Sequence, residues 1–170
     1  MLLLRQLLGL CLLRVGPEAL PGHWRLPLWL ALAYILSGGL MFMQDDGLAV
    51  GMAQAAMDAT LLAGFVWVTL KMRAHPERFI QTYAALLGIS LVFTLVSWPI
   101  FEALPDEFGN EWSWAQIALL GVVLWSLVAQ GQVLRRALDV GAGVGLLLVF
   151  VYFMFSSLLI AAVFSGSAPA

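Results

Sequence analysis

The sequence predicts an all-α integral membrane protein, a bundle of five transmembrane helices with one further helix near the N-terminus. Hydrophobic residues make up 62% of the 170 residues and charged residues only 11%. Soluble domains contain about 45–50% and about 25% of these classes. The apolar residues also fall into five runs, each close to the length of about 20 residues that a spanning helix needs. A bilayer covers this apolar surface, whereas a soluble domain of this size has too little interior to bury it.

Residues 1–25 form a predicted cytoplasmic segment whose helix lies at the membrane surface. The stretch from Met1 to Val15 is rich in leucine, and Arg5 and Arg14 stand at either end of its apolar run. No small-residue cleavage site follows, which argues against a secretory signal peptide. The single cysteine, Cys11, has no partner for an intramolecular disulfide and is expected to act as a small apolar residue.

The transmembrane bundle is predicted to fill residues 26–164, and a short extracytoplasmic tail of residues 165–170 follows it. Short polar connectors separate the spans, and no internal repeat supports an inverted-repeat transporter. The predicted spans are Leu26–Met43, Leu48–Leu70, Phe79–Phe101, Trp114–Leu134 and Gly141–Phe164.

The distribution of charge predicts the orientation of the bundle. Five alternating spans place all 8 basic residues on one side, and basic residues are enriched in cytoplasmic loops. The N-terminus is therefore expected in the cytoplasm and the C-terminus outside. The basic residues are Arg5, Arg14, Arg25, Lys71, Arg73, Arg78, Arg135 and Arg136, and the acidic residues of the opposite side are Asp45, Asp46, Glu102, Asp106, Glu107 and Glu111.

Asp58 is an acidic residue near the middle of the second span. A carboxylate at this depth costs several kcal/mol and usually faces other helices, where it is a candidate functional group. At 100° per residue, Asp58 shares one face of its helix with Gly47, Gly51, Gln54 and Ala55. Small residues four positions apart allow helices to approach closely, so this face is a predicted helix–helix contact with a polar centre.

Other spans carry polar stripes that a bundle can turn toward Asp58. Their members are Tyr83, Ser90, Thr94 and Ser97 on the third span, Ser126 and Gln130 on the fourth, and Tyr152 and Ser156 on the fifth. The predicted intramembrane polar site consists of Asp58, Gln54, Ser90, Thr94 and Tyr152. The predicted packing residues are Gly47, Gly51, Ala55, Gly141 and Gly145, of which the last two form a G-x-x-x-G pair.

Each of these features has two interpretations. In the first interpretation, Asp58 accepts a proton or binds a cation on a transport pathway. In the second, it is a hydrogen-bonding residue that fixes the packing of the helices. The G-x-x-x-G pair mediates dimerisation, or it packs helices within one bundle. The sequence contains no catalytic motif, no metal-ligand pattern and no basic face for nucleic acid, so an enzyme, a cofactor and a nucleic-acid partner are not expected.

The layout of the chain resembles that of the Yip family of small membrane proteins and its bacterial relatives. The resemblance rests on the entry segment Leu12 to Pro21, with the sequence LLRVGPEALP, followed by closely spaced spans to nearly the end of the chain. It implies five spans after a short cytoplasmic segment and an accessory role in membrane organisation. The signature motifs of the eukaryotic members are not evident, so no functional residue is carried over.

The sequence therefore predicts a non-enzymatic protein of the bacterial inner (plasma) membrane. Its expected role is that of an accessory or scaffold subunit, which acts through helix contacts with another membrane protein or with a second copy of itself. The alternative is a small transporter or channel that uses Asp58. These hypotheses differ in what Asp58 must do, because a scaffold needs only a hydrogen bond from it.

Overall fold

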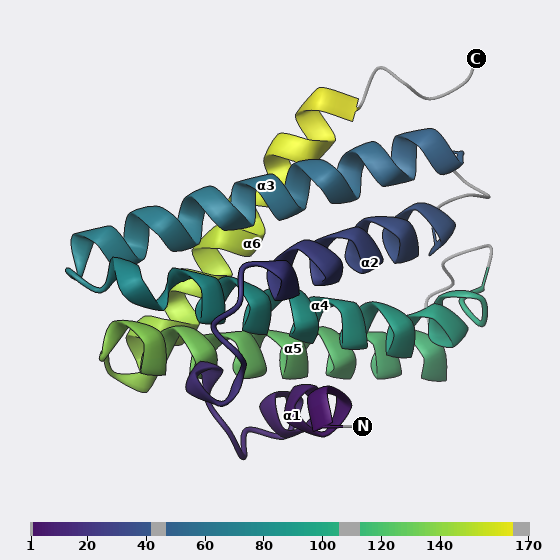
Figure 1. Cartoon of the computed structure of the whole chain (residues 1–170). Coiled ribbons are helices and arrows are strands. Elements are labelled where there is room, and N and C mark those ends of the chain that lie inside the picture. The colour runs from purple at the N-terminus through teal and green to yellow at the C-terminus, as the bar shows by residue number, and fades with distance from the viewer. Residues whose placement is uncertain (1, 42–46, 106–112, 165–170) are drawn as a thin grey trace.

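The computed structural model describes residues 2–41, 47–105 and 113–164. This part of the chain is mainly helical, as predicted (Figure 1). Its α-helices are α1 (Leu2–Cys11), α2 (Arg25–Met41), α3 (Leu48–Met72), α4 (Phe79–Phe101), α5 (Trp114–Leu138) and α6 (Ala142–Phe164), and its short 3-10 helices are η1 (Pro17–Ala19) and η2 (Pro76–Arg78).

Four of these helices, α3 to α6, are long and apolar enough to cross a membrane, so the chain is a multi-pass helical membrane protein. The predicted bounds of the third span agree with α4, and those of the second and fifth differ from α3 and α6 by one or two residues. α2 is a shorter apolar helix of 17 residues. The predicted end of the first span, Met43, lies outside the described residues.

α5 continues four residues beyond the predicted end of the fourth span, to Leu138. The carbonyl groups of its last turn are held by arginines from the connector between α3 and α4. Arg78 Nη1 donates to the carbonyls of Arg136 at 3.3 Å and Ala137 at 3.0 Å, and Arg73 Nε donates to that of Leu138 at 3.3 Å. These bonds satisfy groups that have no partner within the helix, so the helix extends past the apolar run.

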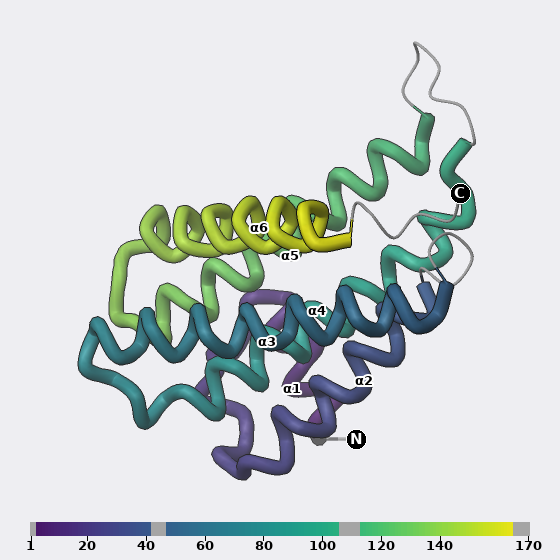
Figure 2. Tube along the Cα trace, turned by 90° about the horizontal axis from the view of Figure 1, so that it is seen from above, coloured from purple at the N-terminus to yellow at the C-terminus, as the bar shows by residue number. Residues whose placement is uncertain are grey.

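The bundle has two ends of different charge. One is called the basic end; the opposite end, where Glu102 follows α4, is called the acidic end. The basic end carries Lys71, Arg73, Arg78, Arg135 and Arg136, and it contains the connections from α3 to α4 and from α5 to α6 (left in Figure 1). At the acidic end α2, α4 and α6 finish and α3 and α5 begin. α4 packs against α1, α2 and α5, while α3 and α6 contact each other across the bundle (Figure 2).

Glycine forms the closest helix contacts. A Cβ atom on Gly51 of α3 would lie 3.2 Å from the Cα atom of Gly39 on α2. A Cβ atom on Gly145 of α6 would lie 2.5 Å from the carbonyl oxygen of Gly131 on α5. Small residues let these backbones touch, as in other membrane helix pairs. Ala55, which is also buried, lies beside Gly38 in the contact of α2 with α3.

Two predicted packing residues, Gly47 and Gly141, do not form such contacts. A Cβ atom on either residue would meet nothing within 4 Å. Gly47 precedes α3 with a φ of +83°, a conformation that glycine adopts without strain, so its role lies in the turn. Gly141 precedes α6, and a Cβ atom at this position would not contact any neighbouring helix of the described chain. Only Gly145 of the G-x-x-x-G pair lies in a helix contact, and that contact is within the chain.

α1 lies beside the middle of α4 and α5, and its predicted position at the membrane surface stays a prediction. Leu7, Leu10 and Cys11 form its buried face, and Leu7 packs on Gly88 near the middle of α4. The indole N–H of Trp125, near the middle of α5, donates to the carbonyl oxygen of Cys11 at 2.9 Å. This hydrogen bond and the packing of Leu7 on Gly88 stabilise α1 against the bundle.

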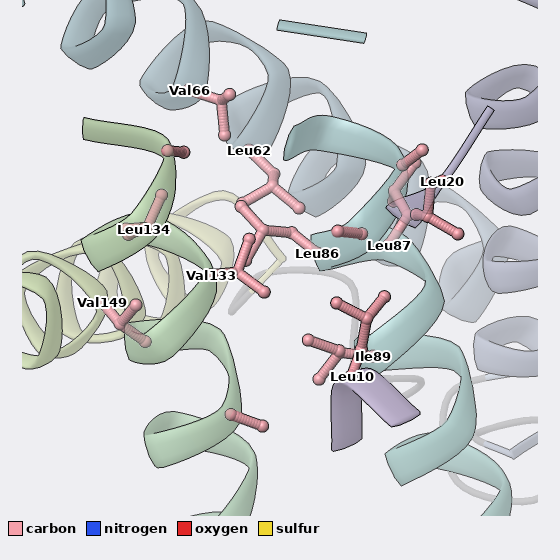
Figure 3. Close-up of a cluster of buried hydrophobic side chains, with 14 of the residues drawn as sticks. Leu10, Leu20, Leu62, Val66, Leu86, Leu87, Ile89, Val133, Leu134 and Val149 are labelled. Carbon is pink, nitrogen blue, oxygen red and sulfur yellow. The ribbon is translucent and has the colours of Figure 1, made fainter. Parts of the chain in front are cut away.

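The half of the bundle nearer the basic end is a closely packed apolar core. Many of its side chains come from α3, α4 and α5, and Figure 3 shows members of these helices together with Leu10, Leu20 and Val149. The members Leu62, Val66, Leu70, Leu86, Leu87, Val133 and Leu134 are each at most 3% exposed.

Candidate functional site

Two tyrosine hydroxyls bind the carboxylate of Asp58. The hydroxyl of Tyr34 on α2 donates to Oδ2 at 2.8 Å, and that of Tyr152 on α6 donates to Oδ1 at 2.7 Å. The Tyr152 hydroxyl also lies 3.0 Å from the main-chain carbonyl oxygen of Asp58. Because the ring of Tyr152 packs against Phe65 with centroids 5.1 Å apart, its hydroxyl is fixed in position. The acid therefore joins α2, α3 and α6.

Asp58 lies on the wall of a cavity of about 550 Å³ that extends from it toward the acidic end. The cavity is bounded by the end of α2, the first half of α3, the second half of α4, the first half of α5 and the second half of α6. Its polar lining residues are Tyr34, Gln54, Asp58, Ser90, Thr94, Ser97, Ser126, Gln130, Tyr152, Ser156 and Ser157. The other lining side chains are mainly aliphatic or aromatic.

The structure brings all five residues of the predicted polar site to this cavity: Gln54, Asp58, Ser90, Thr94 and Tyr152. Among the other polar residues singled out in the sequence, Ser97, Ser126, Gln130 and Ser156 also line it. Tyr83 does not, since it donates to the carbonyl of Ala59 at 3.0 Å. Sequence reasoning missed Tyr34, although a tyrosine midway along the first apolar run was a signal for a buried polar contact.

Several polar side chains of the cavity form no hydrogen bond within the described chain. Ser90, Thr94 and Gln130 are half-buried and bind no other described group. Among the described residues, no fully buried side-chain nitrogen or oxygen lacks a hydrogen-bond partner. The polar atoms of these three residues therefore reach the cavity, where they can bind an occupant.

No ion pair of the described residues involves Asp58. The pairs lie at the basic end, where Arg78 and Asp139 approach to 2.8 Å and Arg136 and Glu18 to 3.2 Å. The residues that line the cavity include no Lys, Arg or His. The carboxylate is therefore held by hydroxyl donors, without a compensating positive charge from this part of the chain.

A second cavity, of about 400 Å³, lies at the basic end between η1, α4 and the end of α5. Arg78, Arg136, Glu18 and Asp139 line it, and the two arginines are paired with the two acids. On the adjacent connector, a hydrogen bond from its own backbone N–H lowers the pKa of Glu77, and His75 at 3.3 Å adds to this effect. These contacts hold the connectors together and leave no unpaired charge for a ligand.

The described residues contain no group of three or more His, Cys, Asp or Glu side chains that could hold a metal ion. No family model, curated protein or solved structure matches the chain. The resemblance to the Yip family therefore stays a prediction from the layout of the sequence.

Proposed function

We propose that this protein is a non-enzymatic membrane protein that binds a ligand in the Asp58 cavity and receives it from the extracytoplasmic side. The supporting observation is the carboxylate itself, bound by Tyr34 and Tyr152 on the wall of a cavity with further unbonded polar groups. Ligand sites are typically concave and mainly apolar, with a few placed polar groups, and span about 300–1,000 Å³. This geometry favours a ligand-binding role, of transporter type, over a purely structural one.

The orientation in this proposal follows the charge of the connectors. With five spans and a cytoplasmic N-terminus, the basic end lies in the cytoplasm and the cavity faces outward. A reporter that is active only outside the cytoplasm should work after Gly109 and at the C-terminus, and fail after His75. Activity of the His75 fusion would reverse the proposed direction of entry.

The closed core argues against entry from the basic end. Side chains such as Leu70, Leu86 and Leu134 are at most 1% exposed, so they block the route from the basic end. This arrangement favours entry of an occupant from the extracytoplasmic side over entry from the cytoplasm. Release toward the cytoplasm would require α3, α4 and α5 to separate at this level.

Cysteine accessibility tests the cavity directly. In a Cys11→Ala background, Thr94→Cys places a thiol on the cavity wall, and Ala85→Cys places one in the closed core of the same helix, where Ala85 is 0% exposed. We expect a membrane-impermeant maleimide added outside intact cells to label Thr94→Cys and to leave Ala85→Cys unlabelled. Equal labelling of the two variants, or none of Thr94→Cys, would contradict an outward-facing cavity.

An accessory subunit is the second candidate, and α6 is the observation that favours it. Along α6, large side chains such as Leu147, Phe155 and Leu158 are 57–72% exposed and could pack against another membrane protein. Purification from native membranes into nanodiscs, with mass spectrometry, tests this candidate. A stoichiometric partner retained by Asp58→Leu but lost on Leu158→Asn would support it, whereas a lone monomer would favour the ligand-binding proposal.

A further inference from the structure

We infer that the occupant of the Asp58 cavity is an organic monocation, with one positive charge carried on an apolar body. This inference rests on the proposed ligand-binding function and adds the chemical class of the ligand. It follows from the charge of the site, the character of the walls and the size of the cavity.

The charge of the site favours binding of a cation. A carboxylate offers about four acceptor positions, and the hydroxyls of Tyr34 and Tyr152 use two of those of Asp58. No cationic side chain lines the cavity. An unpaired carboxylate at membrane depth is costly, and a bound cation would compensate it.

The side chains that line the cavity favour a cation with a large apolar part. Aromatic side chains line the cavity, two of them bound to Asp58, and the face of an aromatic ring attracts an organic cation. The rings that line the cavity are Tyr34, Phe93, Phe101, Tyr152 and Phe153, with Leu62, Leu119, Val122 and Val149 between them. A volume of about 550 Å³ suits a molecule with several rings or a branched alkyl group better than a bare ion.

Other ligand classes fit this site less well. An anion would meet the carboxylate with no basic side chain to bind it. A divalent metal ion prefers several oxygen ligands of which carboxylates are the strongest, and Asp58 is the single carboxylate among the described residues of the lining.

Protection of Thr94→Cys from alkylation in nanodiscs tests this inference. The probes are tetraphenylphosphonium and tetraphenylborate, which have nearly the same size and shape and opposite charge. We expect the phosphonium to slow alkylation at least tenfold and the borate to have no such effect. Asp58→Asn, which keeps the shape and the hydrogen-bonding capacity of the side chain, should remove most of the protection.

The outcomes separate the class of ligand from the function. If Thr94→Cys is labelled from outside but both probes or only the borate protect it, the cationic class is wrong and the ligand-binding proposal stands. If Thr94→Cys is not labelled, the ligand-binding proposal itself fails. Nanodiscs of phosphatidylglycerol, with or without phosphatidylethanolamine, distinguish the sources, because protection by the second lipid alone would identify its ammonium headgroup as the cation.

Discussion

The two halves of this bundle are built from the same four long helices, α3 to α6, yet one half is closed and the other is hollow. Near the basic end, large aliphatic side chains of α3, α4 and α5 meet with almost no exposed surface. Toward the acidic end, the same helices surround a cavity of about 550 Å³. The residues at each level account for this difference.

Small residues bring helix backbones together in both halves, whereas polar residues without interhelical bonds face the cavity in the hollow half. Gly131 and Gly145 bring α5 and α6 into backbone contact in the closed half. In the hollow half the facing positions hold residues such as Ser90, Thr94 and Gln130, which bind no neighbour across the gap. These segments of α4 and α5 therefore lack the close packing that joins α2 to α3 at Gly39 and Gly51.

The contact at Gly145 should produce the largest effect on the closed half. Leucine at this position would meet the backbone of Gly131 and Arg135, so α5 and α6 must separate. We expect Gly145→Leu to lower the free energy of unfolding by about 3 kcal/mol, at the upper end of the range for overpacking. An SDS-unfolding titration in mixed micelles measures this change. Gly141→Leu is the matched control, because its site is open; equal losses in the two variants would mean that this contact does not hold the helices.

Substitutions in the closed half and in the hollow half of α4 should differ in their effect on the free energy of unfolding. Leu87 of α4 is 0% exposed, so Leu87→Ala leaves a void. Because lipid is itself apolar, the cost consists mainly of lost packing, about 2 kcal/mol at the low end of core truncations. Ser90→Ala, at the cavity, should change the free energy of unfolding by less than about 0.5 kcal/mol. Similar values for both variants would show that the two halves are equally packed.

The tyrosines at the boundary between the halves should have a weaker, unequal effect. Tyr152→Phe removes a donor that contacts both Oδ1 and the main-chain oxygen of Asp58, whereas Tyr34→Phe removes a single contact. We expect Tyr152→Phe to lower the free energy of unfolding by about 1 kcal/mol and Tyr34→Phe by less, in line with hydrogen bonds between membrane helices. The same titration compares them, and a larger loss for Tyr34→Phe would argue against the shared Tyr152 hydroxyl.

The thiol of Cys11 should show that the close packing includes α1. Burial raises the pKa of this thiol, so at a given pH less of it is thiolate, the form that reacts. We expect alkylation of the native protein to be slower than that of the SDS-unfolded chain, and to speed up only at higher pH. Equal rates across pH 7–9 would place α1 away from α4 and α5.

Regular helix geometry made much of this architecture predictable. The spans follow from the length of the apolar runs, and the count of 100° per residue placed Gln54 and Asp58 on the face that meets the cavity. The packing of α1 on α4 and α5 was not predictable, because it depends on the space above Gly88 and on the indole of Trp125. The spacing of Gly141 and Gly145 predicted two packing positions, but spacing does not say where along a helix its neighbour crosses.

The hydrogen bond between Cys11 and Trp125 also has a consequence for the order of synthesis. The two residues are 114 positions apart in the chain. The ribosome therefore completes α1 long before it makes the helix that α1 binds, and an interval of this kind favours partly folded intermediates. Until α5 enters the membrane, the leucines of α1 must rest against lipid or an insertion factor. The first helix of the nascent chain is thus among the last to reach its final place.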